Sequence, residues 1–277
     1  MLPIDESESR LMRQYLEEHC SISMGEEKAS MIESRLSGLV LESRCKTFQQ
    51  FHSRAVSENS DRLKNRIVDA MTSEETCWFR DKELWVFLEE VVAPGFIQGV
   101  KKGTQSRVWI AGVSGGQEAY SFTMLLKEAG EAGGGTLSAN EIEILGTDSS
   151  SAALFFAMSG RYNTKSVSQG LSEARRQKHF QREGRCWILN DDLKKTVKYE
   201  QLSLRDSFAR LGKFDLILFR YQTGNFSESY RRTLFTRLSE AMKRSGILLL
   251  GLKESLEGLS DKFEVSSYKG WVVNRLK

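Results

Sequence analysis

The stretch Arg107–Ser121 constrains the fold more than any other part of this chain of 277 residues. An unbroken apolar run, Val108–Ala111, leads into a glycine-containing turn, and a helical pattern follows in which Tyr120, Met124 and Leu125 share one side. This succession predicts a β-strand, a tight turn and an α-helix. Strand, turn and helix in that order are typical of a parallel α/β fold.

The same turn indicates where a ligand could bind. Its glycines, Gly112, Gly115 and Gly116, permit positive φ and let a ligand approach the backbone closely. Glu118 stands where a carboxylate can accept hydrogen bonds from an amino group or a hydroxyl. The turn alone is weak evidence, because many α/β proteins have a glycine-rich first loop.

A second acidic residue favours a nucleoside ligand. Glu141–Asp148 has the pattern of the next parallel strand, and Asp148 ends it where doubly wound folds place the carboxylate that binds a ribose. The phosphate-binding pattern G-x-G-x-x-G is absent, which favours a nucleoside without a pyrophosphate, such as S-adenosylmethionine, over NAD. In the alternative interpretation the glycines only form the turn, and Asp148 is the N-cap of a helix that starts at Ser149.

Composition excludes several other classes of protein. A chain of this length can bury one large core or two modest ones, so we expect one α/β domain with a small helical or β appendage. The formal net charge of +3 is too small to indicate nucleic acid. The 4 Cys and 3 His are scattered, which argues against a metal site or a disulfide framework. No apolar run is long enough to span a membrane and the acidic N-terminus lacks the features of a signal peptide, so we expect a cytosolic protein.

The first part of the chain predicts a small helical domain. Between Ser9 and Met71 four apolar stripes at helical spacing predict short helices that cover one another; the stripes contain Leu11, Tyr15 and Leu16, then Ala29, Ile32, Leu36, Leu39 and Val40, then Phe48, Phe51 and Ala55, and finally Leu63, Ile67 and Met71. The basic excess between Arg44 and Arg66 indicates either an acidic partner or a solvated face.

The next stretch, Met71–Asp81, is unusual for a linker, because a polar run is followed by Trp78, Phe79 and Arg80. In one interpretation the rings stack on a base or face a sulfonium cation, and the guanidinium binds a carboxylate. In the other, the polar run merely starts a helix through a capping arrangement. An apolar helical pattern follows as far as Pro94.

The character of the chain changes between Arg161 and Lys198, where basic residues outnumber acidic ones. Two short strands, Cys186–Leu189 and Val197–Leu202, predict a small antiparallel excursion within the α/β domain. Its positive face either binds a partner or is simply solvated. The α/β pattern then resumes, with strands expected over 213–220 and 245–251, a helix over 230–242 and a closing hairpin from 263 onward.

Four motifs follow one another in an order that is typical of one enzyme family. A Thr-x-x-x-Thr-x-Phe-Phe-Arg motif is matched by Thr72, Thr76, Phe79 and Arg80. A Gly-Cys-Ser-Thr-Gly-Glu-Glu-Pro-Tyr-Ser motif is matched by Gly112, Ser114, Gly116, Glu118, Tyr120 and Ser121. An Ala-Thr-Asp pattern is met by Gly146–Asp148, and an arginine after a buried strand by Arg220. Over nearly the whole chain, these pieces resemble the CheR family, the S-adenosylmethionine-dependent protein-glutamate O-methyltransferases of bacterial chemotaxis receptors.

The resemblance implies an α/β fold. We expect a Rossmann-like class I methyltransferase domain over residues 72–277 with an inserted small antiparallel β subdomain at about 161–200, preceded by a small all-α N-terminal domain over residues 1–71. The insert is short between Phe180 and Trp187, which argues against the subset of the family that docks on a receptor's C-terminal pentapeptide.

The implied activity is methyl transfer from S-adenosylmethionine to glutamate carboxylates of chemotaxis receptors, with S-adenosylhomocysteine as product. The implied partner is the cytoplasmic domain of a chemotaxis receptor or a related signalling protein. We expect a cytoplasmic monomer that binds no nucleic acid and does not insert into a membrane.

The resemblance also implies which residues form the site. Glu118 and Asp148 would hold the amino acid or ribose groups of the cofactor, and Arg80 and Arg220 would lie at the methyl-transfer site as catalytic residues. Further contacts with the cofactor are implied for Thr76, Arg80, Gly112, Ser203, Leu204 and Arg220. No metal is expected.

Some positions depart from the family pattern. Tyr221 and Asn225 stand where the family has Asn and Tyr, and Ser203 and Glu74 each replace an Asn. These positions lie around the cofactor and the acceptor. A second hypothesis therefore stays open, in which the chain is a catalytically weak or inactive CheR-like binding or regulatory module.

Overall fold

The computed structural model describes residues 2–20, 22–25, 28–72, 76–133, 141–224 and 226–277. The predictions made for Glu74 and Asn225 concern positions outside the described residues. The chain divides into two compact units: one comprises Met1–Glu74 and Gln222–Leu234, and the other comprises Glu75–Tyr221 and Phe235–Lys277. The sequence did not predict that a segment from the second half of the chain groups with the N-terminal region.

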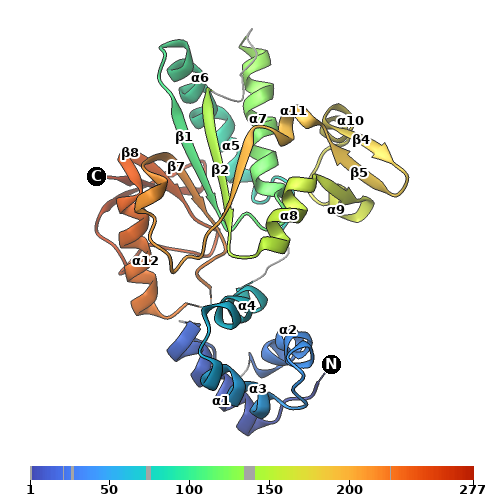
Figure 1. Ribbon diagram of the computed structural model, residues 1–277. Helices are drawn as coiled ribbons and strands as arrows, with labels where there is room; N and C mark the ends of the chain where they lie inside the picture. Colours follow the sequence, from blue (N-terminus) through green and yellow to red (C-terminus); the bar gives the residue numbers. More distant parts are fainter. Residues whose placement is uncertain (1, 21, 26–27, 73–75, 134–140, 225) are drawn as a thin grey trace. The chain divides into compact units, whose positions relative to one another are not determined.

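Amphipathic helices build the first unit, as their apolar stripes predicted (Figure 1); they are α1 (Glu6–Cys20), α2 (Ala29–Glu42), α3 (Phe48–Glu58) and α4 (Asp61–Thr72). Their apolar faces form a core that includes Tyr15, Leu16 and Phe51. The Thr47 hydroxyl starts α3 by accepting a hydrogen bond from the backbone N–H of Gln50 at 3.1 Å. In the same unit Ile22 pairs with Phe226 through an isolated antiparallel bridge.

A seven-stranded sheet forms the centre of the second unit, in the order β6-β2-β1-β7-β8-β10-β9. Its strands are β1 (Ser106–Ala111), β2 (Ile142–Asp148), β6 (Val197–Gln201), β7 (Phe214–Phe219), β8 (Met242–Leu249), β9 (Phe263–Tyr268) and β10 (Trp271–Leu276). The strands from β6 to β8 are parallel, whereas β10 and β9 continue the sheet as the antiparallel hairpin that the sequence predicted.

Helices cover this sheet on both faces (Figure 1); they are α6 (Ala93–Lys101), α7 (Gln117–Ala132), α8 (Ser151–Ser159) and, of α12 (Glu228–Glu240), the part from Phe235 that belongs to this unit. Burial on both faces explains why β1 and β7 have apolar runs without alternation. The chain leaves β1 for β2 on one side and reaches β7 on the other. The carboxyl ends of β1 and β7 therefore flank the topological switch point, where doubly wound folds bind ligands.

The helical pattern that we expected to end at Pro94 continues past it. Helix α5 (Lys82–Phe87) leads through one π turn (Leu88–Val92) directly into α6. Proline lacks a backbone N–H and disturbs a regular α-helix at this point. The π turn accommodates it by changing the hydrogen-bond pattern, since the N–H of Ala93 donates to the carbonyl of Leu88.

The insert is a small three-stranded antiparallel sheet with short helices, and it includes β3 (Arg161–Asn163), α9 (Thr164–Ser168), α10 (Glu173–His179), β4 (Phe180–Glu183), β5 (Cys186–Leu189) and α11 (Asp191–Lys194). The prediction that Val197–Leu202 belongs to this excursion was wrong. Val197–Gln201 is β6, the parallel edge strand of the main sheet beside β2. Buried residues at Val197 and Leu202 let this strand cover the sheet edge, and the N–H of Leu202 donates to the carbonyl of Asp148 at 2.9 Å.

Candidate functional site

The glycine turn after β1 has the tight geometry that the sequence predicted. Gly112 and Gly116 have φ of 71° and 86°, and Ser114 between them has φ of 48°. A Cβ atom on Gly116 would lie 3.0 Å from side-chain atoms of Ala157 and Tyr120, so this position has no room for a larger residue. The turn therefore brings the backbone after β1 close against α7 and α8.

Asp148 ends β2 beside this turn. Its two carboxylate oxygens accept hydrogen bonds from the backbone N–H groups of Ser114 at 2.8 Å and Ser150 at 3.0 Å. Burial raises the pKa of Asp148, although these hydrogen bonds act in the opposite direction. Asp148 is not the N-cap of the next helix, because the Ser150 hydroxyl fills that role by accepting from the N–H of Ala153 at 3.2 Å. The carboxylate instead fixes the glycine turn and remains partly exposed.

A buried arginine stands at the carboxyl end of β7. The Arg220 guanidinium is 2% exposed and forms ion pairs with Glu118 at the start of α7 and with Asp81, whose Oδ2 lies 2.5 Å from an Arg220 nitrogen. The same nitrogen donates to the carbonyl of Arg80 at 2.9 Å. Burial alone would lower the pKa of Arg220, but the two carboxylates outweigh burial and raise it.

Tyr221 follows with a left-handed backbone, φ 59°, which is uncommon for a bulky residue. Its N–H donates to Oε2 of Glu254 at 2.7 Å, and its hydroxyl donates to Asp81. The Arg80 guanidinium lies 3.4 Å over the centre of the Tyr221 ring. A Cβ atom at Gly251 would lie 2.9 Å from the same ring, so the ring fits closely beside that glycine.

The loop that carries Arg80 has an unusual backbone. Phe79 and Asp81 have φ of 47° and 66°, although neither is glycine. The N–H of Phe79 donates to the Ser121 hydroxyl on α7 at 3.1 Å, and the Trp85 indole N–H donates to the carbonyl of Arg80 at 2.9 Å. Contacts with other elements thus hold the loop in a conformation that its own residues do not favour.

The structure brings together some of the residues that the sequence predicted for the site. Arg80, Glu118 and Arg220 form one polar cluster with Asp81 and Tyr221. Gly112 and Asp148 lie at the neighbouring turn. The backbone N–H of Gly112 donates to the carbonyl of Thr147 on β2, and the carboxylate of Asp148 accepts from the N–H of Ser114 in the turn. Thr76 is half-buried at the start of the loop.

Ser203 and Leu204 follow β6, which lies three strands away from β7 in the sheet. Their polar contacts lead elsewhere: the N–H of Ser203 donates to the nearby Asp206 at 2.9 Å, and the carbonyl of Leu204 accepts from Arg237 on α12 at 2.8 Å. The structure therefore does not join these two residues to the cluster around Arg220.

Sequence reasoning missed two members of the cluster, Asp81 and Glu254. Asp81 directly follows the matched arginine, and a carboxylate beside Arg80 could have been recognised as a partner for a buried cation. Glu254 accepts hydrogen bonds from the N–H groups of both Tyr221 and Gly251, at 2.7 and 2.8 Å. No local pattern indicates the contact between Glu254 and Tyr221, which lie 33 positions apart in the sequence.

Comparisons with known proteins match one family along nearly the whole chain. The model of the CheR methyltransferase all-alpha domain matches residues 7–72, and that of the CheR methyltransferase SAM binding domain matches residues 74–271. Chemotaxis protein methyltransferase 1 of Pseudomonas aeruginosa is 33% identical, with 96% of this chain and 97% of that protein covered. Chemotaxis protein methyltransferase Cher2 of Pseudomonas putida is 32% identical, with 96% of each chain covered. Chemotaxis protein methyltransferase of Vibrio parahaemolyticus is also 32% identical, over 100% of this chain and 99% of that one. Among the described residues, no helix has the length and apolar character needed to cross a membrane.

Proposed function

The chain belongs to the CheR methyltransferase family, and from that premise we propose that it transfers the methyl group of S-adenosylmethionine to glutamate carboxylates of a chemotaxis receptor. The observation that carries the proposal is the cluster after β7, in which Arg220 pairs with Glu118 and the Arg80 guanidinium lies over the ring of the next residue, Tyr221. A buried cation paired with two partly shielded carboxylates, a second arginine close by and a turn that suits a nucleoside fit a transfer to an anionic acceptor.

The cofactor of the matched domain is S-adenosylmethionine, and the residues of the glycine turn fit it. The oxygens of Asp148 accept backbone hydrogen bonds from Ser114 and Ser150 and, as carboxylate oxygens with two lone pairs each, can also accept from a ribose hydroxyl. Glu118, at the first turn of α7, would accept from the amino group of the cofactor, and the positive φ of Gly112 lets the backbone pass close to it. We propose further cofactor contacts for Thr76, Arg80, Arg220, Ser203 and Leu204 from their match to the family motifs.

The reaction asks the protein for alignment more than for acid–base chemistry. S-adenosylmethionine, when bound, supplies a methyl group on a sulfonium that an ionised carboxylate can attack directly. Arg80 would orient the acceptor carboxylate: its face stacks on Tyr221, so a carboxylate approaches the N–H groups at its edge. Arg220 holds Glu118 and Asp81 in place through ion pairs that are largely shielded from water. Such positioning can supply several kcal/mol of the barrier.

A second candidate is a binding or regulatory module without methyl transfer. The observation that favours it is the Tyr221 ring, which stands where the family has Asn and lies against the Arg80 guanidinium. If that ring blocks the acceptor, the chain would bind S-adenosylmethionine or its product and a partner, but would not methylate it.

For the partner we propose the cytoplasmic domain of a chemotaxis receptor or a related signalling protein, because the relatives are chemotaxis protein methyltransferases. Such a domain is reached from the cytoplasm, which is the proposed location. We further propose that the chain acts as a monomer.

The proposal is tested in two steps. Calorimetric titration with S-adenosylmethionine and S-adenosylhomocysteine should first show micromolar binding. Receptor cytoplasmic fragments should then take up a radioactive methyl group, and mild base should release it as methanol, as expected for a methyl ester. Fragments with Glu→Gln substitutions at the methylated positions should lose the label. Cofactor binding without any labelled fragment would favour the module that only binds.

Arg80→Ala is the variant that tests the assigned role within this experiment. Because misplacement of a reacting group by about 1 Å can lower the rate about 100-fold, turnover should fall about 100-fold, far more than the affinity for the cofactor. Lys82→Ala removes an exposed neighbouring cation and should behave like the wild type. Equal turnover by Arg80→Ala would remove this arginine from the mechanism.

A further inference from the structure

The insert holds the loop that carries Arg80. The N–H of Trp78 donates to the carbonyl of Gln169 at 3.1 Å, and the fully buried Trp78 ring meets Tyr162 and Phe180 edge-on, with ring centres 4.8 and 5.4 Å apart. Gly170 lies so close that a Cβ atom there would be 1.9 Å from the carbonyl oxygen of Trp78. The loop thus packs on the insert through both its backbone and its first ring.

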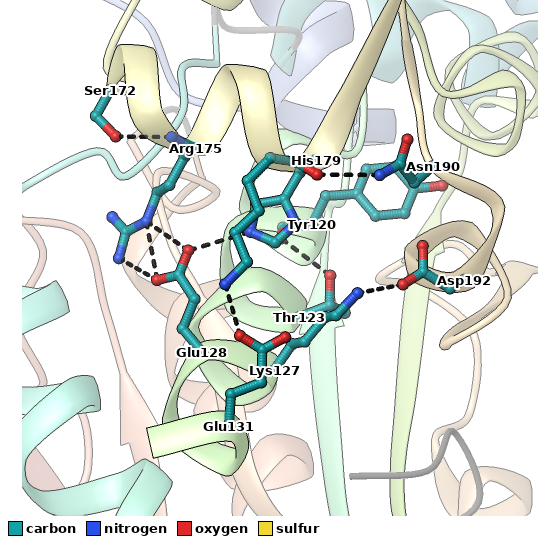
Figure 2. A network of polar contacts seen from close by, with 11 residues as sticks. Tyr120, Thr123, Lys127, Glu128, Glu131, Ser172, Arg175, His179, Asn190 and Asp192 are labelled. Carbon is teal, nitrogen blue, oxygen red and sulfur yellow. Dashed lines mark hydrogen bonds and ion pairs between the residues drawn. The ribbon is translucent and has the colours of Figure 1, made fainter. Parts of the chain in front are cut away.

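One residue of the insert also reaches the next ring of the loop. The Arg175 guanidinium lies 4.0 Å over the centre of the Phe79 ring. Its Nε and one terminal nitrogen bind the carboxylate of Glu128 on α7, at 3.0 and 2.7 Å (Figure 2). The other oxygen of that carboxylate lies 3.1 Å from Nε2 of the fully buried His179. The guanidinium is therefore fixed in plane and direction, and its face is directed at the ring.

Outer ion pairs join α7 to helices of the insert without reaching the ring. Lys178 of α10 pairs with Glu131 of α7 at 2.6 Å. Lys127 of α7 pairs with Asp192 of α11 (Figure 2). These pairs are 36% to 54% exposed at their side chains, so water and salt weaken them. The pair of Arg175 with Glu128 is only 27% and 25% exposed and is bidentate, which makes it the stronger connection.

The backbone of the loop needs such support. The left-handed conformations of Phe79 and Asp81 cost on the order of 1 to 2 kcal/mol each for residues with a side chain. Without contacts from outside, the loop would relax to other conformations, and Arg80 and Asp81 would move with it. A contact that fixes the Phe79 ring therefore fixes the two residues that meet Arg220.

We propose that Arg175 is a positioning residue, which holds Phe79 and through it the arrangement of Arg80 and Asp81 at the methyl-transfer site. As a statement about turnover this rests on the proposed function; as a statement about the loop it does not. The planar face of the guanidinium is required, because Glu128 fixes it and Phe79 packs on it. A lysine would keep the charge toward Glu128 but would offer no face to the ring.

Amide hydrogen exchange, read by mass spectrometry, tests the loop directly in the full-length protein. In Arg175→Ala and in Arg175→Lys, exchange at Trp78–Lys82 should become about tenfold faster than in the wild type, because local opening becomes easier. Lys178→Ala, a neighbouring cation of the same helix, should leave this exchange unchanged. In an active enzyme, kcat of both Arg175 variants should fall about tenfold, with less than about threefold change in the Kd for S-adenosylhomocysteine.

A pair of glycine variants tests the same idea without changing a charge. Gly170→Ala must displace Trp78, whereas Gly184→Ala has open space around its Cβ, and both positions have positive φ. Faster exchange at Trp78–Lys82 in Gly170→Ala alone would agree with the proposal. Wild-type exchange in Arg175→Lys, or faster exchange spread evenly over α7 and the insert in Arg175→Ala, would overturn it. A wild-type chain that methylates nothing would count against the proposed function only, since exchange and cofactor binding need no acceptor.

Discussion

Arg220 carries a buried charge, which would destabilise the fold if it had no partner. Transfer of a guanidinium or a carboxylate from water costs several kcal/mol for each ion, and attraction between the ions offsets this only when geometry and hydrogen bonds are good. Here two carboxylates face one guanidinium, which also donates to the carbonyl of Arg80. The cluster stabilises the fold only when all three charges are present, because removal of one partner leaves another charge shielded from water without its counter-ion.

Replacement of the cation should therefore be more harmful than its position at the rim of the sheet suggests. Arg220→Met leaves Glu118 and Asp81 without their shared cation, and we expect a loss of about 3 to 5 kcal/mol in the free energy of unfolding. Urea unfolding followed by circular dichroism measures it. Arg10→Met breaks an exposed pair with Glu6, 72% and 92% exposed, and should change stability by less than about 0.5 kcal/mol. Similar losses of stability in the two variants would contradict a stabilising role for the ion pairs of Arg220 with Glu118 and Asp81.

The sequence predicted single residues of the site better than their contacts. Glu118 and Asp148 could be placed because each follows a strand or turn with a recognisable pattern, and the structure has them at those places. The pairing of Glu118 with Arg220 spans 102 positions, and no local pattern contains it. Tyr221 was predicted only as a replacement for the family's Asn; its left-handed φ of 59° lies in a region that Asn tolerates better than a bulky residue does.

At the level of elements, the sequence predicted the strands and helices that have a pattern of their own. Apolar runs located β1, β2 and β7, and helical stripes located α1 to α4. Strand β6 was assigned to the wrong sheet, because a short strand with one buried face looks the same in a small antiparallel excursion and at a parallel edge. The π turn before Pro94 was also missed, since a proline in a sequence usually indicates the end of a helix.

The contact between α7 and α10 makes stability depend on acid pH. Burial acts to raise the pKa of Glu128, but hydrogen bonds from His179 and Arg175 outweigh it and lower the pKa from 4.5 to about 2. A carboxylate with a lowered pKa in the folded state stabilises in full above its unfolded pKa of 4.5 and loses this as the pH falls toward 2. At about 1.4 kcal/mol for each pKa unit the loss is at most about 3 kcal/mol, because Glu128 is partly exposed and solvent screens its charge.

Glu128→Gln should remove this part of the pH dependence. Urea unfolding between about pH 5 and about pH 2.5, where the carboxylate takes up a proton in the unfolded state but stays ionised in the folded state, should show a flatter decline of stability for the variant than for the wild type. Glu131 lies on the same helix and pairs with Lys178, but this ion pair is exposed and screened by solvent. The pH profile of Glu131→Gln should therefore stay close to that of the wild type. Parallel profiles for Glu128→Gln and the wild type would mean that other carboxylates dominate.

At the scale of the whole chain, the two compact units are not two consecutive parts of the sequence. The segment Gln222–Leu234 begins directly after Tyr221 and groups with the N-terminal helices. Within that unit Phe226 is 6% exposed, pairs with the fully buried Ile22, and packs edge-on against Tyr230 with ring centres 5.0 Å apart. Because the pairing joins residues about two hundred positions apart, only the folded chain brings them together.

This grouping predicts how the full-length chain responds to the loss of one ring. Phe226→Ala should cost about 3 to 5 kcal/mol, the range for a buried Phe, and should open the segment around it. Limited trypsin digestion, mapped by mass spectrometry, should then cut faster after Arg231 and Arg232, which lie in that segment. Cleavage after Arg185, exposed in the hairpin of the insert, should keep its wild-type rate.

Phe155→Ala is the matched control, because this ring is 74% exposed and its loss should change neither stability nor cleavage. If Phe226→Ala accelerated all three cleavages equally, the chain would be unfolding as one body. Selective cleavage at Arg231 and Arg232 would instead show that Gln222–Leu234 and the N-terminal helices open as one cooperative unit.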